Sequence, residues 1–397
     1  MTRIHRLEDA ELAGKRVLVR VDFNVPLKDG AVADASRIEA ALPTIRYLKE
    51  KGARIALISH LGRPKGKRAE EFSLAPIQPV LAELLDTPVL FVPDCVGDEA
   101  RQAAEGLMQG GVALFENLRF HEGEEANDPA FAKALAEPFD IFVEDAFSVS
   151  HRAHASTEGV THHLPAFAGK ALAREIDHLS TVLRDPKRPM MAVVGGAKVS
   201  TKIDVLMALV EKADILAIGG GMANTFMSAK GIDVGKSLNE PDYADTARKI
   251  MDAARTHGCE IMLPADVVVA EKFEADAPSR TVSADRVGQN EMILDAGPES
   301  VDAIAEAIEE ASTLLWNGPL GAFEIPPFDT ATVEAAKYAA KQARAGKLVA
   351  VAGGGDTVAA LRHAGTYEDF TYVSNAGGAF LEWVEGRALP GVEALKR

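Results

Sequence analysis

Cysteine is scarce in this chain of 397 residues, which contains only Cys95 and Cys259. The two lie far apart in the sequence and lack the spacing of metal ligands, so we expect no disulfide framework and a reducing compartment. Long apolar runs are also missing. No segment approaches the roughly 18 residues of a membrane span, and the first residues lack the apolar stretch of a secretory signal. We therefore expect a cytoplasmic protein without a membrane partner.

Basic residues are outnumbered, with 43 lysines and arginines against 59 aspartates and glutamates and a formal net charge of −16. Long-range repulsion opposes the approach of nucleic acid to such a surface, so no nucleic-acid partner is expected. A small anionic ligand would need a local basic pocket. The hydrophobic share of 47% and the charged share of 26% are ordinary for a globular protein and exclude a disordered, collagenous or coiled-coil chain.

Short runs rich in valine and isoleucine alternate with longer amphipathic stretches. The runs predict strands at Val17–Val21, Arg54–Ser59, Val112–Phe115, Ile141–Glu144, Met190–Val194, Ile215–Gly219, Glu260–Leu263, Leu314–Trp316 and Lys347–Val351. The stretches between them predict helices at Arg37–Glu50, Asp204–Lys212, Asp242–His257, Val301–Ala311 and Thr332–Ala345. This alternation is typical of an α/β fold whose parallel sheets are covered by helices on both faces.

The number of predicted strands fits two sheets, and therefore two domains, better than one. We expect the division near residues 170–189, where the helical stretch Arg174–Arg184 runs into Asp185–Pro189 and prolines end the helix. In such sheets ligands bind at the carboxyl ends of the strands, in loops that lead into helices. The site should therefore lie in those loops.

Basic and polar side chains follow four of the predicted strands in the first half. The segments are Arg20–Pro26 with Arg37 at the next helix start, Ser59–Pro64, Glu116–His121, and Asp145–Phe147 leading to His151–His154. Taken singly, each arginine could be a solvated charge, and His151 and His154 could simply cap a loop. Arginine binds phosphate and carboxylate in a bidentate manner, so together the loops predict a cavity for a multiply charged anion. Asp22 and Asn24 would orient hydroxyl groups there.

Glycine-rich loops follow strands of the second half. They are Gly195–Lys202, Gly219–Met222 and Gly353–Thr357. Glycine lets the backbone approach a phosphate closely, and helix N-termini supply amide donors. Lys198 and Lys202 add positive charge, and Asp356 carries the oxygen ligands that Mg²⁺ takes beside nucleotide phosphates. Each glycine loop alone could equally be a tight turn, but the set favours a nucleotide site.

Two further segments allow alternatives. Gly231–Ser237 resembles a P-loop, but only three residues separate its glycines where the motif needs four, and no apolar strand precedes it, so we reject that interpretation. Trp316–Glu324 closes another predicted strand. It could be a turn with aromatic packing, or it could frame an adenosine, with Glu324 accepting from the ribose hydroxyls.

Taken together, these motifs resemble phosphoglycerate kinases. The segments that match the family in order are Arg16–Pro26, Ser59–Pro64, Glu116–His121, His151–Ser156, Gly195–Lys202, Gly219–Met222, Trp316–Glu324 and Gly353–Thr357, and they extend over nearly the whole chain. The resemblance implies two Rossmann-like domains joined by a helix and a hinge. It implies a glycolytic, cytoplasmic monomer that catalyses reversible, Mg²⁺-dependent phosphoryl transfer from 1,3-bisphosphoglycerate to ADP, giving 3-phosphoglycerate and ATP.

The resemblance also implies domain bounds and site residues. A phosphoglycerate-binding domain would span residues 1–172, with residues 382–397 returning to it, followed by an interdomain helix at 173–186 and a nucleotide-binding domain at 187–381. The phosphoglycerate would be held by Asp22, Asn24, Arg37, His60, Arg63, Arg119 and Arg152. The nucleotide would be held by Lys202, Gly219, Gly220, Gly297, Asn317, Glu324, Gly354, Gly355, Asp356 and Thr357, with Asp356 on Mg²⁺. Arg37 and Lys198 would be the catalytic residues nearest the transferred group.

Two segments depart from the family pattern. A glycine usually follows the Asp-Ala-Phe sequence, whereas here Asp145–Phe147 continues as Ser148-Val149-Ser150. Near the end, a common His-Val-Ser-Thr-Gly-Gly-Gly pattern is replaced by Tyr372–Gly378, which places Asn375 and Ala376 within it. We expect the second departure to alter the kinetics of domain closure before it alters the chemistry.

Physical chemistry links the two halves of the chain. Phosphoryl transfer needs alignment, magnesium and cations around the spread charge rather than covalent help. Arg37 and Lys198 are expected to converge when the domains close and exclude water. Two alternatives remain: a dehydrogenase, which the missing dinucleotide fingerprint disfavours, and a hinge-closing binding protein without catalysis. Lys198, Lys202 and Asp356 favour the kinase over the binding protein. A sensor of an organic acid would need no residues that bind a nucleotide or a metal ion.

Overall fold

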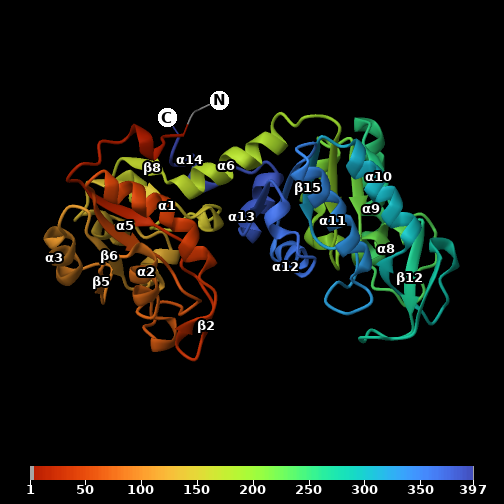
Figure 1. Ribbon diagram of the computed structural model, residues 1–397, viewed down its shortest axis with the longest axis horizontal. Helices are drawn as coiled ribbons and strands as arrows, with labels where there is room; N and C mark the ends of the chain where they lie inside the picture. Colours follow the sequence, from red (N-terminus) through yellow and green to blue (C-terminus); the bar gives the residue numbers. More distant parts are fainter. Residues whose placement is uncertain (1–3, 397) are drawn as a thin grey trace. The chain divides into compact units, whose positions relative to one another are not determined.

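The computed structural model describes residues 4–396, which form two compact units (Figure 1). Unit 1 takes in the described residues up to Asp177 together with those from Ala388 onward, and unit 2 spans His178–Arg387. The division falls within α6 (Lys170–Leu183). None of the helices between residues 4 and 396 is long and apolar enough to cross a membrane.

Unit 1 is built on a parallel sheet of six strands in the order β5-β6-β4-β1-β7-β8. The strands are β1 (Arg16–Arg20), β4 (Arg54–Ile58), β5 (Val89–Val92), β6 (Val112–Phe115), β7 (Ile141–Glu144) and β8 (Ala166–Ala168). The helices are α1 (Ser36–Glu50), α2 (Ile77–Leu85), α3 (Asp98–Gly106), α4 (Glu122–Glu125) and α5 (Pro129–Ala136). Alternate residues of a strand point to opposite faces, so Val17 and Val19 pack with α1 and α2, whereas Leu18 packs with α3 and α5.

The end of the chain returns to unit 1. Gly391 N, in α14 (Pro390–Glu393), donates to Ser150 O at 2.9 Å, and Ile4 forms an antiparallel bridge with Lys396. The return lies at Ala388, past the expected residue 382. The reason is that α13 (Gly377–Val384) still packs against α7 (Ile203–Val210) within unit 2.

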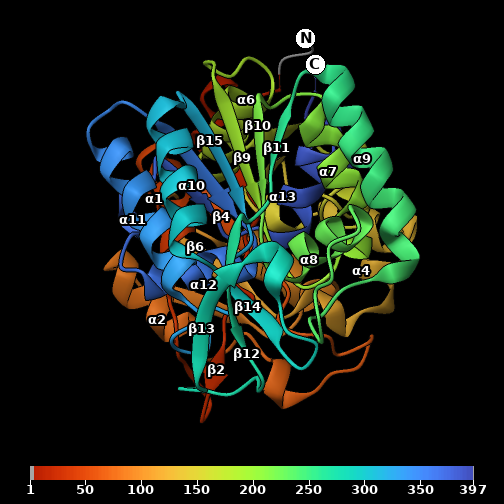
Figure 2. The same cartoon turned by 90° about the vertical axis from the view of Figure 1, so that its right-hand side faces the viewer.

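Unit 2 contains a second parallel sheet, in the order β11-β10-β9-β15-β16-β17. Its strands are β9 (Met190–Val194), β10 (Ile215–Ile218), β11 (Glu260–Met262), β15 (Thr313–Asn317), β16 (Val349–Gly353) and β17 (Tyr372–Ser374). Its other helices are α8 (Gly220–Ala229), α9 (Ala244–His257), α10 (Pro298–Glu310), α11 (Thr330–Arg344) and α12 (Gly355–His363). Figure 2 shows α10 and α11 on one side of this sheet and α7 and α9 on the other. The α/β fold with two helix-covered parallel sheets is therefore confirmed.

Two small antiparallel elements were not predicted. β12 (Asp266–Ala270) pairs with β13 (Ser279–Ser283) and β14 (Met292–Ala296) in unit 2, and β2 (Leu27–Lys28) pairs with β3 (Ala31–Val32) in unit 1. β13 has the sequence Ser-Arg-Thr-Val-Ser and is almost wholly exposed. Because it buries so little apolar surface, β13 lacks a valine and isoleucine run of the kind used to predict strands. β12 has such a run at Val267–Val269 and was nevertheless missed.

Candidate active site

The basic loops of unit 1 come together at the carboxyl ends of its strands. His60, which follows β4, is almost fully buried, and burial is the main cause that holds its pKa well below the usual value. Four nearby guanidinium groups lower the pKa of His60 further, and they belong to Arg20, Arg119, Arg152 and Arg37. Since the charges of all four guanidinium groups influence the same imidazole, these groups lie near His60. The structure therefore gathers the arginines that the sequence had placed in separate loops.

His60 is neutral in this cluster and is oriented by Arg20. Arg20 Nη2 lies 3.0 Å from His60 Nδ1. A guanidinium group can only donate, so Nδ1 is the acceptor and the ring proton is on Nε2. His60 thus offers one N–H donor rather than a positive charge.

Arg20 begins one of the predicted basic segments but was not assigned to ligand binding, and in the structure it supports the cluster from its buried side. It is fully buried, and its Nε donates to Ser156 Oγ at 3.0 Å, which in turn donates to Glu124 Oε1 at 2.6 Å. Burial raises the pKa of both Glu124 and Glu144, while Arg20 opposes that rise. Arg20 and the neighbouring carboxyl groups of Glu124 and Glu144 therefore fix the loops that carry the cluster around His60. A buried support of this kind has no sequence signature, because its members come from four separate segments.

Arg119 presents buried donors that the described residues leave unused. Its side chain is only 3% exposed, and its Nη1 donates to Gly62 O at 2.7 Å. Its Nη2 is buried and has no hydrogen-bond partner among residues 4–396. Burial is the main cause that lowers the pKa of Arg119, and Arg152 and Arg20 lower it further, while Glu125, whose Oε1 lies 3.3 Å from Arg119 Nε, opposes the shift. The unbonded Nη2 of this buried guanidinium group is suited to an anionic ligand, because leaving it unbonded is costly.

Asp22, Asn24 and Arg37 form a hydrogen-bonded group beside these arginines. Arg37 Nη1 donates to Asp22 Oδ2 at 2.7 Å, and Asn24 Oδ1 accepts from Gly62 N at 2.9 Å. Ser148, one of the departures from the family pattern, donates from Oγ to the same Asp22 Oδ2 at 2.6 Å. Arg63 is exposed on the loop after β4. Arg37 is only partly buried, with 35% of its side chain exposed.

Unit 2 contains a cavity of about 530 Å³ at the carboxyl ends of its strands. Its wall includes the predicted residues Gly220, Glu324 and Asp356, and also Gly196, Leu238 and Phe273. Leu238 and Phe273 are large apolar side chains that are more than half exposed. Exposed apolar groups on a cavity wall are typical of a ligand site. Neither was predicted, because nothing in the sequence around them distinguishes a cavity wall from a loop.

Lys202, Asn317 and Thr357 form a rigid cluster next to this cavity. Lys202 Nζ donates to Gly195 O at 2.7 Å and to Asn317 O at 3.1 Å. Thr357 Oγ1 accepts from Gly318 N at 2.7 Å. Asn317 Nδ2 donates to Gly353 O at 2.6 Å. These three side chains therefore hold the glycine loops in position.

The glycines at this edge are needed for close backbone packing. Gly220 has a φ of +66°, and a Cβ there would lie 2.7 Å from Gly196 O. A Cβ on Gly297, at the start of α10, would lie 2.2 Å from Asp266 Oδ2. Gly219 lies at the start of α8, where the amides of Gly219 and Gly220 already donate to Val194 O and Leu320 O at 3.0 and 2.8 Å. Gly354 and Gly355 lie at the start of α12, and a helix start of this kind offers amide groups to a ligand.

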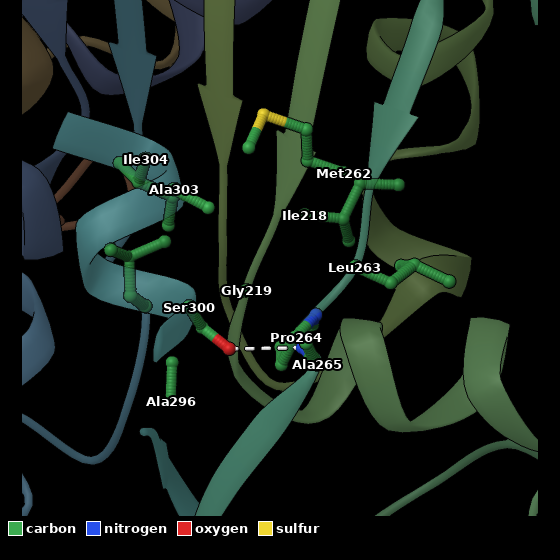
Figure 3. Close-up of a pocket in the computed structure, with 11 residues that line it drawn as sticks. Ile218, Gly219, Met262, Leu263, Pro264, Ala265, Ala296, Ser300, Ala303 and Ile304 are labelled. Atoms are coloured by element: carbon green, nitrogen blue, oxygen red, sulfur yellow. Dashed lines mark hydrogen bonds between the residues drawn. The ribbon is translucent and has the colours of Figure 1, made fainter. Parts of the chain in front are cut away.

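A second, small cavity in unit 2 does not form a ligand site. A cavity of about 40 Å³ is lined mainly by Ile218, Met262, Leu263 and Ile304, with the Ser300 hydroxyl already bonded to Ala265 N at 2.9 Å (Figure 3). Such a small apolar space is a packing gap.

Asp94, Cys95 and His121 lie close enough together to suggest a metal site. Their groups are already used, since Asp94 Oδ1 lies 2.7 Å from both His121 Nε2 and Cys95 N. Burial also raises the pKa of the Cys95 thiol well above its usual value. A protonated thiol beside a satisfied carboxylate is a hydrogen-bonded loop rather than a metal centre.

The combination of an arginine-lined anion site and a glycine-lined cavity on two α/β units is typical of enzymes that transfer a phosphoryl group between a small anion and a nucleotide. The family model described as phosphoglycerate kinase matches residues 7–387. The chain therefore belongs to the phosphoglycerate kinase family. This membership decides against the dehydrogenase and the non-catalytic binding protein.

Similar proteins support the assignment over the full length. The chain is 60% identical to a phosphoglycerate kinase of Maricaulis maris, over 100% of this chain and 98% of the relative. It is 59% identical to one of Caulobacter vibrioides, with 98% of each chain covered. The solved phosphoglycerate kinase of Coxiella burnetii superposes with a TM-score of 0.93 at 42% identity, over 99% of both chains. That of Pyrococcus horikoshii gives 0.84 at 32% identity, over 99% of this chain and 98% of the other.

Proposed function

We propose that this enzyme transfers a phosphoryl group from 1,3-bisphosphoglycerate to ADP, reversibly and with Mg²⁺, as a cytoplasmic monomer. The observation that carries the proposal is the set of arginines around His60, with the unpaired buried donor of Arg119 among them. Arg37, His60, Arg63, Arg119 and Arg152 would bind the phosphate and carboxylate groups of the phosphoglycerate. Asp22 and Asn24 would accept from and orient its hydroxyl group.

The nucleotide would occupy the cavity of unit 2. The start of α12 would supply amide donors to its phosphates, together with the charge of Lys202, and Gly219 and Gly220 would let the backbone lie close to the ligand. Glu324, exposed on the cavity wall, would accept from the ribose hydroxyls. Asp356 fits a magnesium ion, because its carboxylate is exposed in the first turn of α12 on that same wall. When bound, the ion neutralises charge on the nucleotide phosphates.

In the transfer step, a β-phosphate oxygen of ADP forms a bond to phosphorus while the bond from phosphorus to the acyl oxygen breaks. The electron pair of that bond remains on the carboxylate of 3-phosphoglycerate. Arg37 and Lys198 would stabilise the charge on the oxygens of the transferred group. Since the proposed phosphoglycerate residues belong to unit 1 and the nucleotide residues to unit 2, we infer a hinge-bending closure about α6 that brings the two substrates together and excludes water.

The test is an assay of ADP formation from ATP in the reverse direction. ADP should form only when 3-phosphoglycerate, ATP and Mg²⁺ are all present, and chelation of the metal should abolish the rate. ADP formation without 3-phosphoglycerate would indicate a simple ATPase. The absence of both activity and substrate binding would overturn the proposal.

Lys202 predicts a pH dependence of nucleotide binding. Burial lowers the pKa of Lys202 to about 8, although Asp356 partly opposes the shift. The ammonium group is therefore charged below pH 8 and loses its proton above it. We expect kcat/KM for ATP, which reports the free enzyme, to be flat from pH 6.5 to about 7.5 and then to fall roughly tenfold per pH unit above 8.

A second group near this cavity titrates in the same range and must be separated from Lys202. Burial also raises the pKa of the Asp295 carboxyl to about 8, so the cavity wall gains negative charge as the pH rises. Lys202→Arg keeps its charge throughout and should give a flat profile, whereas Asp295→Asn should retain the fall. The opposite pattern would assign the pH dependence to Asp295.

A further inference from the structure

Ser148 lies against the carboxylate that holds Arg37. Its Oγ donates to Asp22 Oδ2 at 2.6 Å, and Arg37 Nη1 donates to the same oxygen at 2.7 Å. Ser148 and Asp22 are 126 residues apart in the sequence. One carboxylate oxygen thus connects the turn after β7 with the loop after β1 and the first turn of α1.

The other oxygen of this carboxylate is also engaged. Asp22 Oδ1 accepts from Asn24 N at 3.2 Å, and the Asp22 side chain is only 15% exposed. Rotation of the carboxylate would therefore break contacts on both oxygens. Without the Ser148 hydroxyl, Oδ2 would keep only the longer of its two hydrogen bonds, the one from Arg37.

The turn that carries Ser148 is itself firmly anchored. Ser150 N donates to Phe147 O at 3.0 Å, and Ser150 Oγ donates to Ala146 O at 3.2 Å. Ala146 N donates to the buried Glu144 Oε1 at 2.8 Å. Because the backbone of this turn is fixed, the Ser148 hydroxyl has little freedom. Its hydrogen bond therefore determines the orientation of the Asp22 carboxylate.

We propose that Ser148 is a positioning residue for the phosphoryl transfer, whose hydroxyl group fixes the Asp22 carboxylate and, through it, the guanidinium group of Arg37. The inference rests on the proposed function. Ser148 acts through Asp22 and need not touch the transferred group. Its loss lets Asp22 turn with Arg37, so that the guanidinium group spends less time in the orientation that transfer requires.

The test compares Ser148→Ala with Ser283→Ala. Both substitutions remove one hydroxyl that donates to a carboxylate and keep a Cβ. Ser283 Oγ donates to Asp285 Oδ1 at 2.7 Å on the exposed surface of unit 2, so only the first substitution removes a hydrogen bond to Asp22. For Ser148→Ala we expect kcat, measured as ADP formation, to fall about threefold to tenfold, the factor that corresponds to the net contribution of one hydrogen bond. The KM for ATP should be unchanged and the melting temperature nearly so. Ser148→Thr keeps the hydroxyl and should recover most of the rate.

A double-mutant cycle checks that the effect passes through Asp22. In an Asp22→Asn background, which removes the charge of the acceptor, adding Ser148→Ala should lower kcat by less than a further twofold. Full activity of Ser148→Ala in an active wild-type background would overturn the inference and leave the proposed function intact. An equal loss in Ser283→Ala, or additive losses in the cycle, would overturn it as well. An inactive wild-type enzyme would instead reject the proposed function.

Discussion

Replacement of Arg37 by alanine is expected to lower kcat by about 10³-fold or more, the effect typical of an arginine that stabilises a transferred phosphoryl group. Arg37 stands in the first turn of α1, and Asp22 binds one of its nitrogens at 2.7 Å. Its side chain is 35% exposed, so the rest of the fork can reach a ligand. A planar fork matches phosphoryl oxygens in a way that a single ammonium group does not, and Arg37→Lys should therefore recover only part of the rate. The measurement is kcat at saturating ATP and 3-phosphoglycerate.

Arg46→Ala is the matched control for this variant. Arg46 belongs to the same helix and its Nη2 donates to Leu84 O at 3.0 Å, on the exposed surface. The control removes an equal charge from α1 without touching the cluster around His60, so kcat should stay within about twofold. A retained kcat in Arg37→Ala, or a similar loss in both variants, would remove Arg37 from the catalytic step.

The parallel strands could be predicted from the sequence because both of their faces are buried. β6 and β9 have only buried residues, which requires an unbroken apolar run, and their predicted bounds match the structure. β5 was missed, although its four residues Val-Leu-Phe-Val form an apolar run as long as that of β6. The rejection of a P-loop at 231–237 is also confirmed, since these residues follow α8 and not a strand.

The convergence of the arginines could be predicted for a topological reason. The carboxyl ends of β1, β4, β6 and β7 share one edge of a parallel sheet, so the residues that follow them are neighbours in space. Contacts between side chains from distant segments could not be predicted in the same way. The buried chain from Arg20 through Ser156 to Glu124, and the bond from Ser148 to Asp22, depend on rotamers and depth rather than on local pattern.

Lys198 is expected to act on the rate far more than on binding, because of how its loop is held. On one side, Ser200 N and Oγ donate to Glu240 at 2.9 and 2.6 Å. Further on, Lys202 Nζ is bonded to the carbonyls of Gly195 and Asn317. The backbone of this loop is therefore fixed, while the Lys198 side chain itself is exposed. A mobile ammonium group on a rigid loop can meet charge that develops only during transfer.

Lys198→Ala should accordingly lower kcat about 10²- to 10³-fold, as expected for a donor that acts mainly in the transition state, while the dissociation constants of ATP and 3-phosphoglycerate change by less than about threefold. Lys230→Ala removes an equally exposed charge at the end of α8 and should leave both quantities unchanged. Isothermal titration would give the dissociation constants and steady-state assays would give kcat. If binding and turnover fell equally, Lys198 would be a ground-state binding residue, and the stabilisation of the transferred group would have to come from Arg37 and the magnesium ion.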